Sequence, residues 1–374
     1  MRFLLHMGIG IAILLIALLV FKKERKLADF YLIAWIGIFF CQLLFYEFSL
    51  YQRGLNSFWA ILGFSFPLLN MPLLYGYIRA LIGRPLNPKE LLSHVSPFLL
   101  YFFIFLGTKY LLDIEVQTAK GYLTLEGPVP SWLQLYPIPL AILGFVYCIW
   151  NLILLRQHKK NLPQIFSYSE SINLNWIRYL IYGYLLFTLF GLVLIFGATN
   201  FGLFDIDSVF GILAAVIGLM VAATGFWGLQ QTDIFSTVPT PSIPNIQAEA
   251  EPYQKSGLAP ERAQRLAEQL RTFMEEEHLY LNEELTLPLL AEAVNLSPAH
   301  LSQVINQQFG KNFFDFVNAY RVEEAKKRLR NPEFSHFSIL AIGLDCGFRS
   351  KSSFNRAFKK FVGSTPSEYR KMEG

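Results

Sequence analysis

The chain has 374 residues, of which 53 % are hydrophobic and only 16 % are charged, and its formal net charge is +4. An average soluble domain carries about 25 % charged residues, so this composition excludes a single soluble domain. Three cysteines at unrelated positions exclude a disulfide framework and show no metal-ligand spacing. Apolar residues are concentrated before about residue 230, and the remainder has the composition of a soluble protein.

Seven apolar runs fill the first part of the chain. They cover residues 3–21, 30–51, 57–83, 92–112, 132–155, 176–198 and 207–229. A membrane-spanning helix needs about 20 mostly apolar residues, and the lack of water in lipid forces the backbone to be helical. A basic cluster follows the first run, whereas a cleaved signal peptide has its positive charge before the apolar stretch. We therefore predict a seven-helix transmembrane domain over residues 1–229, with the first helix retained.

Basic residues are divided unequally between the loops that join these runs. With the N-terminus outside, the inner loops hold nine of them: Lys22, Lys23, Arg25, Lys26, Arg84, Lys89, Arg156, Lys159 and Lys160. The outer segments hold four: Arg2, Arg53, Lys109 and Lys120. Basic residues in short loops favour the cytoplasmic side. The sequence therefore predicts a multi-pass membrane protein whose N-terminus is outside and whose C-terminal part is in the cytoplasm.

Three features of this part are each open to more than one interpretation. The third run is interrupted by Pro67, Asn70 and Pro72. This interruption is either an irregularity of helix packing or part of a functional site. Charged residues near the predicted outer ends, such as Glu47, form either a solvated rim or a ligand pocket. The alternating stretch 121–127 is interpreted as a small hairpin or a lid.

The composition changes at about residue 230. From there to residue 258, four prolines are interleaved with Ser, Thr, Asn and Gln. Such a segment cannot bury a core, so we predict a flexible linker over residues 230–258. Its reach is about 30 Å, which would keep the following domain close to the membrane.

Helical periodicity is strong in the last part of the chain, residues 259–374. It predicts helices over 262–277 and 285–294 and, after a short turn, a third helix. Ser297 is placed to cap that helix, with Pro298 at its first position. Apolar residues recur at helical spacing on one face, and the opposite face is polar. This is the pattern of a helix-turn-helix motif, whose second helix enters the major groove of DNA.

A second copy of this pattern follows. The segments 297–310 and 350–363 both begin with a serine, place apolar residues four, eight and twelve positions later, and end with a glycine. A long helix, predicted over 313–330, would separate them. Two such motifs in one rigid body can place recognition helices in successive major grooves, about 34 Å apart.

Charge supports contact with DNA. Residues 309–374 carry 13 basic and 7 acidic residues, whereas residues 259–308 carry 3 and 8. Basic side chains that would contact phosphates, and so position the domain, are Lys326, Lys327, Arg328, Arg330, Lys359 and Lys360. Side chains able to read base edges are Gln303, Lys351, Asn355 and Arg356.

The segment from residue 285 to 370 resembles the AraC/XylS-type DNA-binding domain. Residues 347–370 read GFRSKSSFNRAFKKFVGSTPSEYR, a long match to the signature of that family. The resemblance implies a core that includes Phe348, Phe354 and Phe358. It also implies base-reading residues on two helices: Ala299, Ser302 and Gln303 on the first, and Lys351, Ser352, Asn355 and Arg356 on the second. Gly343 stands where the family usually has alanine, which implies a less rigid second motif.

The sequence thus predicts a chain with two parts: a seven-helix membrane bundle and a cytoplasmic all-α domain with two helix-turn-helix motifs. The expected function is a membrane-embedded bacterial transcription regulator that couples a signal to promoter binding. Alternatives are a bundle that only anchors the regulator, and a transporter with a regulatory DNA-binding tail. Expected partners are double-stranded DNA, the lipid of the inner membrane, a second copy of the chain and a small-molecule or membrane-borne signal. No pattern indicates an enzyme, a catalytic residue, a metal or a cofactor.

Overall fold

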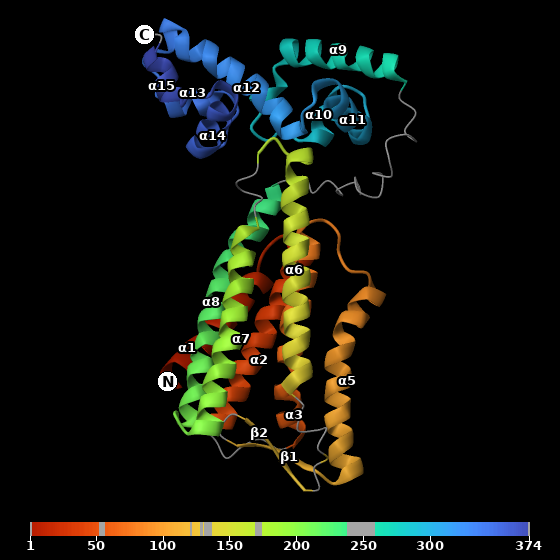
Figure 1. Cartoon of the computed structure of the whole chain (residues 1–374), viewed down its shortest axis with the longest axis vertical. Coiled ribbons are helices and arrows are strands. Elements are labelled where there is room, and N and C mark those ends of the chain that lie inside the picture. Colours follow the sequence, from red (N-terminus) through yellow and green to blue (C-terminus); the bar gives the residue numbers. More distant parts are fainter. Residues whose placement is uncertain are drawn as a thin grey trace. The chain divides into compact units, whose positions relative to one another are not determined.

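The structure of the protein is a computed structural model. It describes residues 2–51, 57–119, 122–127, 130, 137–168, 174–237 and 259–372. Packing divides the chain into two compact units, coloured along the sequence in Figure 1: Met1–Arg156 with Leu174–Thr240, and Gln157–Asn173 with Pro241–Gly374. The described residues are nearly all helical, which confirms the predicted all-α class.

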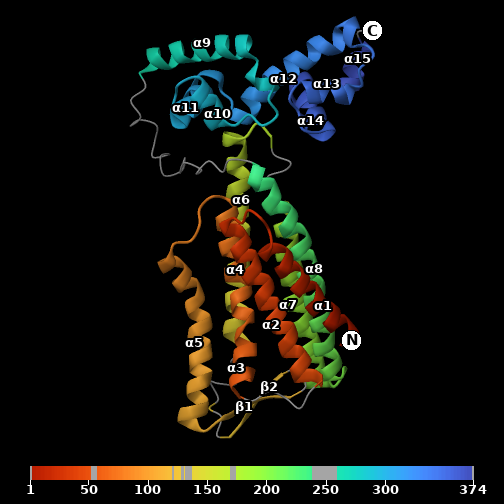
Figure 2. The ribbon, with the colours of Figure 1, turned by 180° about the vertical axis from the view of Figure 1, so that it is seen from behind.

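The first unit is a helical bundle. Its helices are α1 (Arg2–Val20), α2 (Leu27–Tyr51), α3 (Ser57–Ser65), α4 (Pro67–Leu81), α5 (Pro88–Leu112), α6 (Pro137–Ile165), α7 (Asn175–Phe201) and α8 (Ile206–Thr237). Figure 2 shows α1, α2 and α8 side by side, and these three helices contact one another. Among the described residues, seven helical segments are long and apolar enough to cross a membrane, and α3 and α4 together form one of them.

The third apolar run is two helices. Helix α3 ends at Ser65, whose hydroxyl donates to the carbonyl oxygen of Ile61, and α4 begins at Pro67. Proline has no N–H to continue the hydrogen bonds of the preceding helix, so the break falls beside it. Pro72, by contrast, lies inside α4 without ending it.

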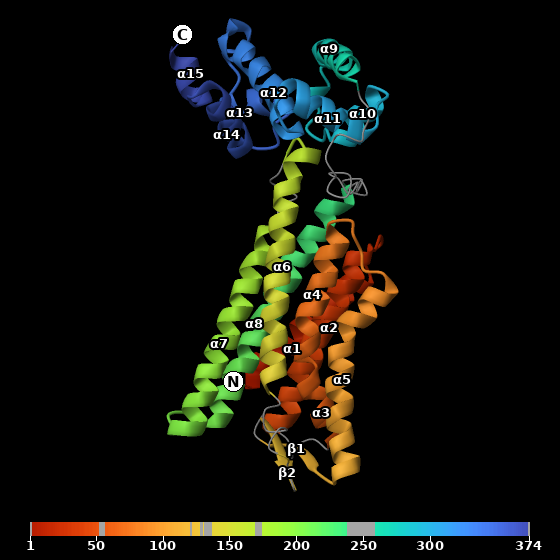
Figure 3. The same ribbon diagram turned by 45° about the vertical axis from the view of Figure 1, so that its right-hand side comes forward.

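A short hairpin lies at the end of the bundle where α3 begins (Figure 3). Strand β1 (Glu115–Ala119) pairs antiparallel with β2 (Tyr122–Glu126), and Glu115 lies opposite Glu126. Val116 is fully buried, and β1 packs against α3. The alternating stretch thus contributes β2 to a hairpin.

The second unit holds the helices of the two predicted motifs. They are α9 (Pro260–Glu277), η3 (Leu279–Leu281), α10 (Leu287–Ala293), α11 (Pro298–Phe309), α12 (Phe313–Arg330), η4 (Pro332–Phe334), α13 (Ile339–Asp345), α14 (Lys351–Val362) and α15 (Pro366–Met372). The long helix predicted over 313–330 has those bounds in the structure. Helix α10 begins two residues after the predicted start, because Thr286 caps it.

Each motif has its own hydrophobic core. The first core joins α9, α10, α11 and the start of α12, and includes Leu301 and Phe316. The second joins the end of α12 to α13, α14 and α15, and includes Phe348, Phe354 and Phe358. All three phenylalanines are buried, as the family resemblance implies. Helix α12 thus contributes to both cores, which makes it the physical link between the motifs.

The division between the units differs from the predicted domains in two ways. Helix α8 continues to Thr237, beyond the predicted end of the bundle at residue 229. The segment Gln157–Asn173, predicted as an inner loop of the membrane domain, groups with the C-terminal unit. Residues 238–258 of the predicted linker lie outside the described residues.

Candidate DNA-binding interface

The first recognition helix, α11, begins as its sequence predicts. The Ser297 hydroxyl accepts a hydrogen bond from the N–H of His300 at 3.2 Å, and Pro298 occupies the first turn. Gly310 ends the helix with a positive φ of 63°, which glycine adopts without strain. Leu301, Val304 and Ile305 are fully buried and fix the inner face.

The base-reading residues assigned to α11 differ in exposure. Ala299 is exposed, but Ser302 and Gln303 retain only 6 % and 3 % of their surface. Asn306 donates to the carbonyl oxygen of Ser302 at 2.8 Å, and the amide of Gln303 donates to Gln307 at 3.4 Å. Two of the three side chains are therefore covered in this conformation, and their role in reading bases stays a prediction.

The second recognition helix, α14, presents its assigned residues more openly. Ser350 and Ser353 form a capping box, in which each side chain bonds the backbone N–H of the other residue. Lys351, Ser352 and Arg356 are exposed, and Asn355 is half-buried. They lie on the face opposite Phe354 and Phe358, whose rings meet edge to face. The polar face of α14 has the composition and exposure that a major groove requires.

Most of the cations assigned to phosphates have partners within the domain. Lys326 pairs with Glu323 at 2.8 Å, Arg328 with Glu324 at 2.8 Å, and Lys360 with Asp315 at 2.6 Å. Lys327 lies 3.9 Å from Glu324, and the Arg330 guanidinium lies 4.9 Å from the centre of the Tyr369 ring. Solvent-exposed pairs contribute about 0–1 kcal/mol to stability, whereas Arg328 and Glu324 are partly buried, with 18 % and 20 % of their side-chain surface exposed. Lys359 is exposed beside them.

A buried arginine joins the two motifs. Arg321 of α12 is 1 % exposed, and it donates to the carbonyl oxygens of Tyr280 at 2.6 Å and Asn282 at 2.7 Å. Its guanidinium also lies 5.8 Å from the centre of the Phe348 ring, in the second motif. Burial, and then the charge of Arg349, lower the pKa of Arg321 to about 9, so it stays charged at neutral pH. Sequence reasoning missed this residue, because an arginine on a helix is usually solvated.

Two glycines allow close packing around the second motif. A Cβ on Gly343 would lie 2.4 Å from the Phe354 ring, so the missing methyl makes room for that side chain. This gives a packing reason for the departure from the family pattern. Gly347 has a φ of +87°, and a Cβ there would lie 2.6 Å from the Tyr280 carbonyl oxygen. The backbones of the two motifs therefore meet at Gly347.

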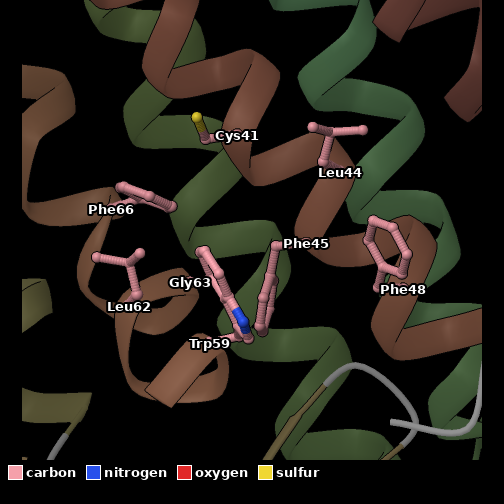
Figure 4. Close-up of a pocket in the computed structure, with 8 residues that line it drawn as sticks. All are labelled: Cys41, Leu44, Phe45, Phe48, Trp59, Leu62, Gly63 and Phe66. Atoms are coloured by element: carbon pink, nitrogen blue, oxygen red, sulfur yellow. The ribbon is translucent and has the colours of Figure 1, made fainter. Parts of the chain in front are cut away.

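Two cavities among the described residues of the bundle differ in their lining. One, of about 380 Å³, is apolar and lies between α2 and α3 (Figure 4); its lining residues are Cys41, Leu44, Phe45, Phe48, Trp59, Leu62, Gly63 and Phe66. The other, of about 100 Å³, is lined by aromatic rings together with Gln42 and Asn70. Gln42 Nε2 and Asn70 Oδ1 are buried and have no hydrogen-bond partner among the described residues. No group of three or more His, Cys, Asp and Glu side chains in the described part of the chain could hold a metal.

Two capped helix-turn-helix motifs joined by a shared long helix define a class of double-stranded DNA-binding domain. Comparison with known proteins agrees. Residues 290–372 match the helix-turn-helix domain family of AraC type. The C-terminal part of the chain is therefore a DNA-binding domain of the kind found in transcription regulators.

Two bacterial transcription regulators match about a quarter of the chain. An uncharacterized HTH-type transcriptional regulator of Staphylococcus aureus (strain COL) is 39 % identical over 92 residues, which are 25 % of this chain and 12 % of that protein. An HTH-type transcriptional regulator of Mycobacterium tuberculosis is 33 % identical over 82 residues, or 22 % of this chain and 30 % of that one. The match thus spans about an eighth of the Staphylococcus relative.

One solved structure that is similar to part of the chain is the C-terminal domain of AraT, a response regulator from Geobacillus stearothermophilus. It is 30 % identical and aligns with 31 % of this chain and 88 % of that chain, with a TM-score of 0.26.

Proposed function

We propose that the protein is a membrane-embedded transcription regulator that reads a specific DNA sequence and couples this to a signal sensed by its helical bundle. The observation that carries the DNA-binding part is the pair of capped recognition helices, α11 and α14, in a domain that matches known regulators. The two motifs would occupy successive major grooves on one face of the duplex. Within them, Lys351, Ser352, Asn355 and Arg356 would read bases.

Genome-wide occupancy of the crosslinked full-length protein tests this proposal. The wild type is expected to give discrete peaks of occupancy. The Arg356→Ala variant is expected to bind its DNA sites about 5- to 150-fold more weakly, because one bidentate base contact is worth about 1–3 kcal/mol. Lys371→Ala is the matched control, because Lys371 is an exposed cation of α15, outside both recognition helices. Wild-type peaks that persist unchanged in Arg356→Ala would exclude base reading by α14.

Membrane embedding rests on the seven apolar helices and on the unequal charge of the loops. In the proposed topology the N-terminus is outside the inner membrane and the DNA-binding domain is in the cytoplasm. Alkaline phosphatase fused after Glu126 is then expected to be active, because β2 would be outside. The same enzyme fused after Lys89 is expected to be inactive, and a fluorescent protein fused after Gly374 to fluoresce. The reverse pattern of phosphatase activity would refute this topology.

A sensing role of the bundle, as opposed to a role as an anchor, is supported by the cavity of about 100 Å³ that Gln42 and Asn70 line. An unsatisfied buried polar group costs about 1–3 kcal/mol, and Gln42 and Asn70 each present one. A ligand with both a donor and an acceptor would satisfy them. A second copy of the chain is a further proposed partner, since confinement to one membrane raises the effective concentration for dimerisation.

A further inference from the structure

Three residues that follow α6 are bound to the DNA-binding domain. Phe166, Ser167 and Tyr168 belong to the C-terminal unit and retain 5 %, 2 % and 5 % of their surface. Phe166 forms an antiparallel bridge with Thr286, the residue that caps α10. The segment thus lies against the start of the first motif as a short extended peptide.

Ser167 has every polar group engaged. Its N–H and its hydroxyl both donate to the carbonyl oxygen of Leu285, at 3.4 and 2.7 Å. Its own carbonyl accepts from Asn318 and from Arg321, both at 3.2 Å, and its hydroxyl accepts from Arg321 at 3.1 Å. Hydrogen bonds from a charged, buried donor are among the stronger ones in proteins. The DNA-binding domain thus holds Ser167 by a hydrogen bond to each of its polar groups.

Tyr168 extends the contact to the second motif. The Arg349 guanidinium lies 3.8 Å from the centre of the Tyr168 ring, a close cation–π contact. Arg349 also pairs with Glu284 of the first motif at 2.9 Å, and it directly precedes Ser350, the cap of recognition helix α14. The segment therefore contacts the first motif, the connecting helix and the second motif.

The docked segment lies on the face that DNA would use. In Figures 1, 2 and 3 the end of α6 reaches α12 between α11 and α14, on the side of α12 where both recognition helices lie. Residues Gln157–Ile165 of α6 group with this unit, so their place beside these helices is part of its own packing. A duplex bound by both recognition helices must pass across the gap between them.

We propose that residues 166–168 and the end of α6 are an internal competitor of DNA: the domain binds either this segment or its operator, and release of the segment permits DNA binding. This rests on the proposed function and supplies its coupling step, because α6 begins in the bundle. A signal that moves α6 and α7 would then withdraw the segment and open the interface.

A disulfide that locks the docked state gives the decisive test. Paired residues across an antiparallel bridge have Cα atoms about 4.5–5.5 Å apart, which a disulfide can span. Phe166→Cys combined with Thr286→Cys, in the full-length protein in lipid nanodiscs, is expected to crosslink on oxidation. The oxidised protein is expected to bind operator DNA at least about tenfold more weakly than the same protein after reduction with dithiothreitol. Each single cysteine variant, oxidised in parallel, is the control.

The converse variant should release the segment. Ser167→Ala with Tyr168→Ala removes two hydroxyl hydrogen bonds and the ring over Arg349, and it leaves the recognition helices intact. Operator affinity is expected to rise about tenfold. Failure of the double cysteine variant to crosslink, or equal DNA binding in its locked and reduced forms, would overturn the competition. If neither the wild type nor any variant binds DNA, the proposed function itself fails. That result differs from DNA binding that is equal with and without the disulfide, which contradicts only the competition.

Discussion

Arg321→Leu is expected to lower the free energy of unfolding of the C-terminal unit by about 3 kcal/mol. The leucine would leave the buried carbonyl oxygen of Tyr280 and the partly buried carbonyl oxygen of Asn282 without their donor, and an unsatisfied buried group costs about 1–3 kcal/mol. Ser167 loses two further bonds. Part of the loss is offset, because the variant no longer buries a charge, which is why the expected value is below the sum of the individual costs.

The thiol of Cys346 can report this loss in the full-length protein. It is fully buried in the core of the second motif, and burial raises its pKa to about 12, so it reacts with an alkylating reagent only when the domain opens. With Cys41 and Cys148 replaced by alanine, Arg321→Leu is expected to speed labelling about a hundredfold. Lys327→Leu, on an exposed position of the same helix, should change it little. Equal labelling of the two variants would mean that Arg321 does not join the motifs.

Local signals in the sequence were enough to predict the elements that carry the proposed site. The serine caps of α11 and α14 and the long helix α12 all depend on residues within one or two helical turns of each other. Helix capping and hydrophobic periodicity act at that range, so a single sequence reveals them. The same is true of the buried phenylalanines of α14, which recur at helical spacing.

What the sequence could not show depends on contacts between distant residues. Ser167 binds Arg321, which is 154 positions away, and neither residue type indicates such a pairing. The ion pair of Lys360 with Asp315 likewise joins separate helices, so a run of lysines assigned to phosphates is partly neutralised. Periodicity places a side chain on a face of its own helix, but tertiary packing decides what covers that face. Ser302 and Gln303 lie on the predicted face of α11 and are nevertheless buried.

The third apolar run shows a further limit. Its length predicted one spanning helix, and the prolines within it allowed a kink at either position. The structure breaks at Pro67 and continues through Pro72. The break leaves α3 as a separate helix that packs on α5 and on the hairpin, contacts that hydropathy does not encode.

Gly347→Ala is expected to separate the two motifs and to reduce operator affinity more than about tenfold. Two costs combine at this position. Alanine is strained at a φ of +87°, by about 1–2 kcal/mol. Its Cβ would also lie 2.6 Å from the Tyr280 carbonyl oxygen and 2.8 Å from that of Leu281, and these are backbone atoms that cannot rotate away. The second motif must therefore shift, which displaces α14 from the register set by α11.

Gly363→Ala isolates the first cost, the strain of a positive φ. Its φ of +86° imposes nearly the same strain, but no atom lies within 4 Å of the Cβ position, so only the conformational cost remains. Both variants should speed the labelling of Cys346, and labelling of Gly347→Ala should be at least tenfold faster than that of Gly363→Ala. Only Gly347→Ala should weaken DNA binding strongly. If the two variants behave alike, the contact between the motifs at Gly347 does not set the spacing of the recognition helices. A larger effect at Gly347 would mean that the rigid junction, and not the two helices separately, determines which DNA spacing the domain accepts.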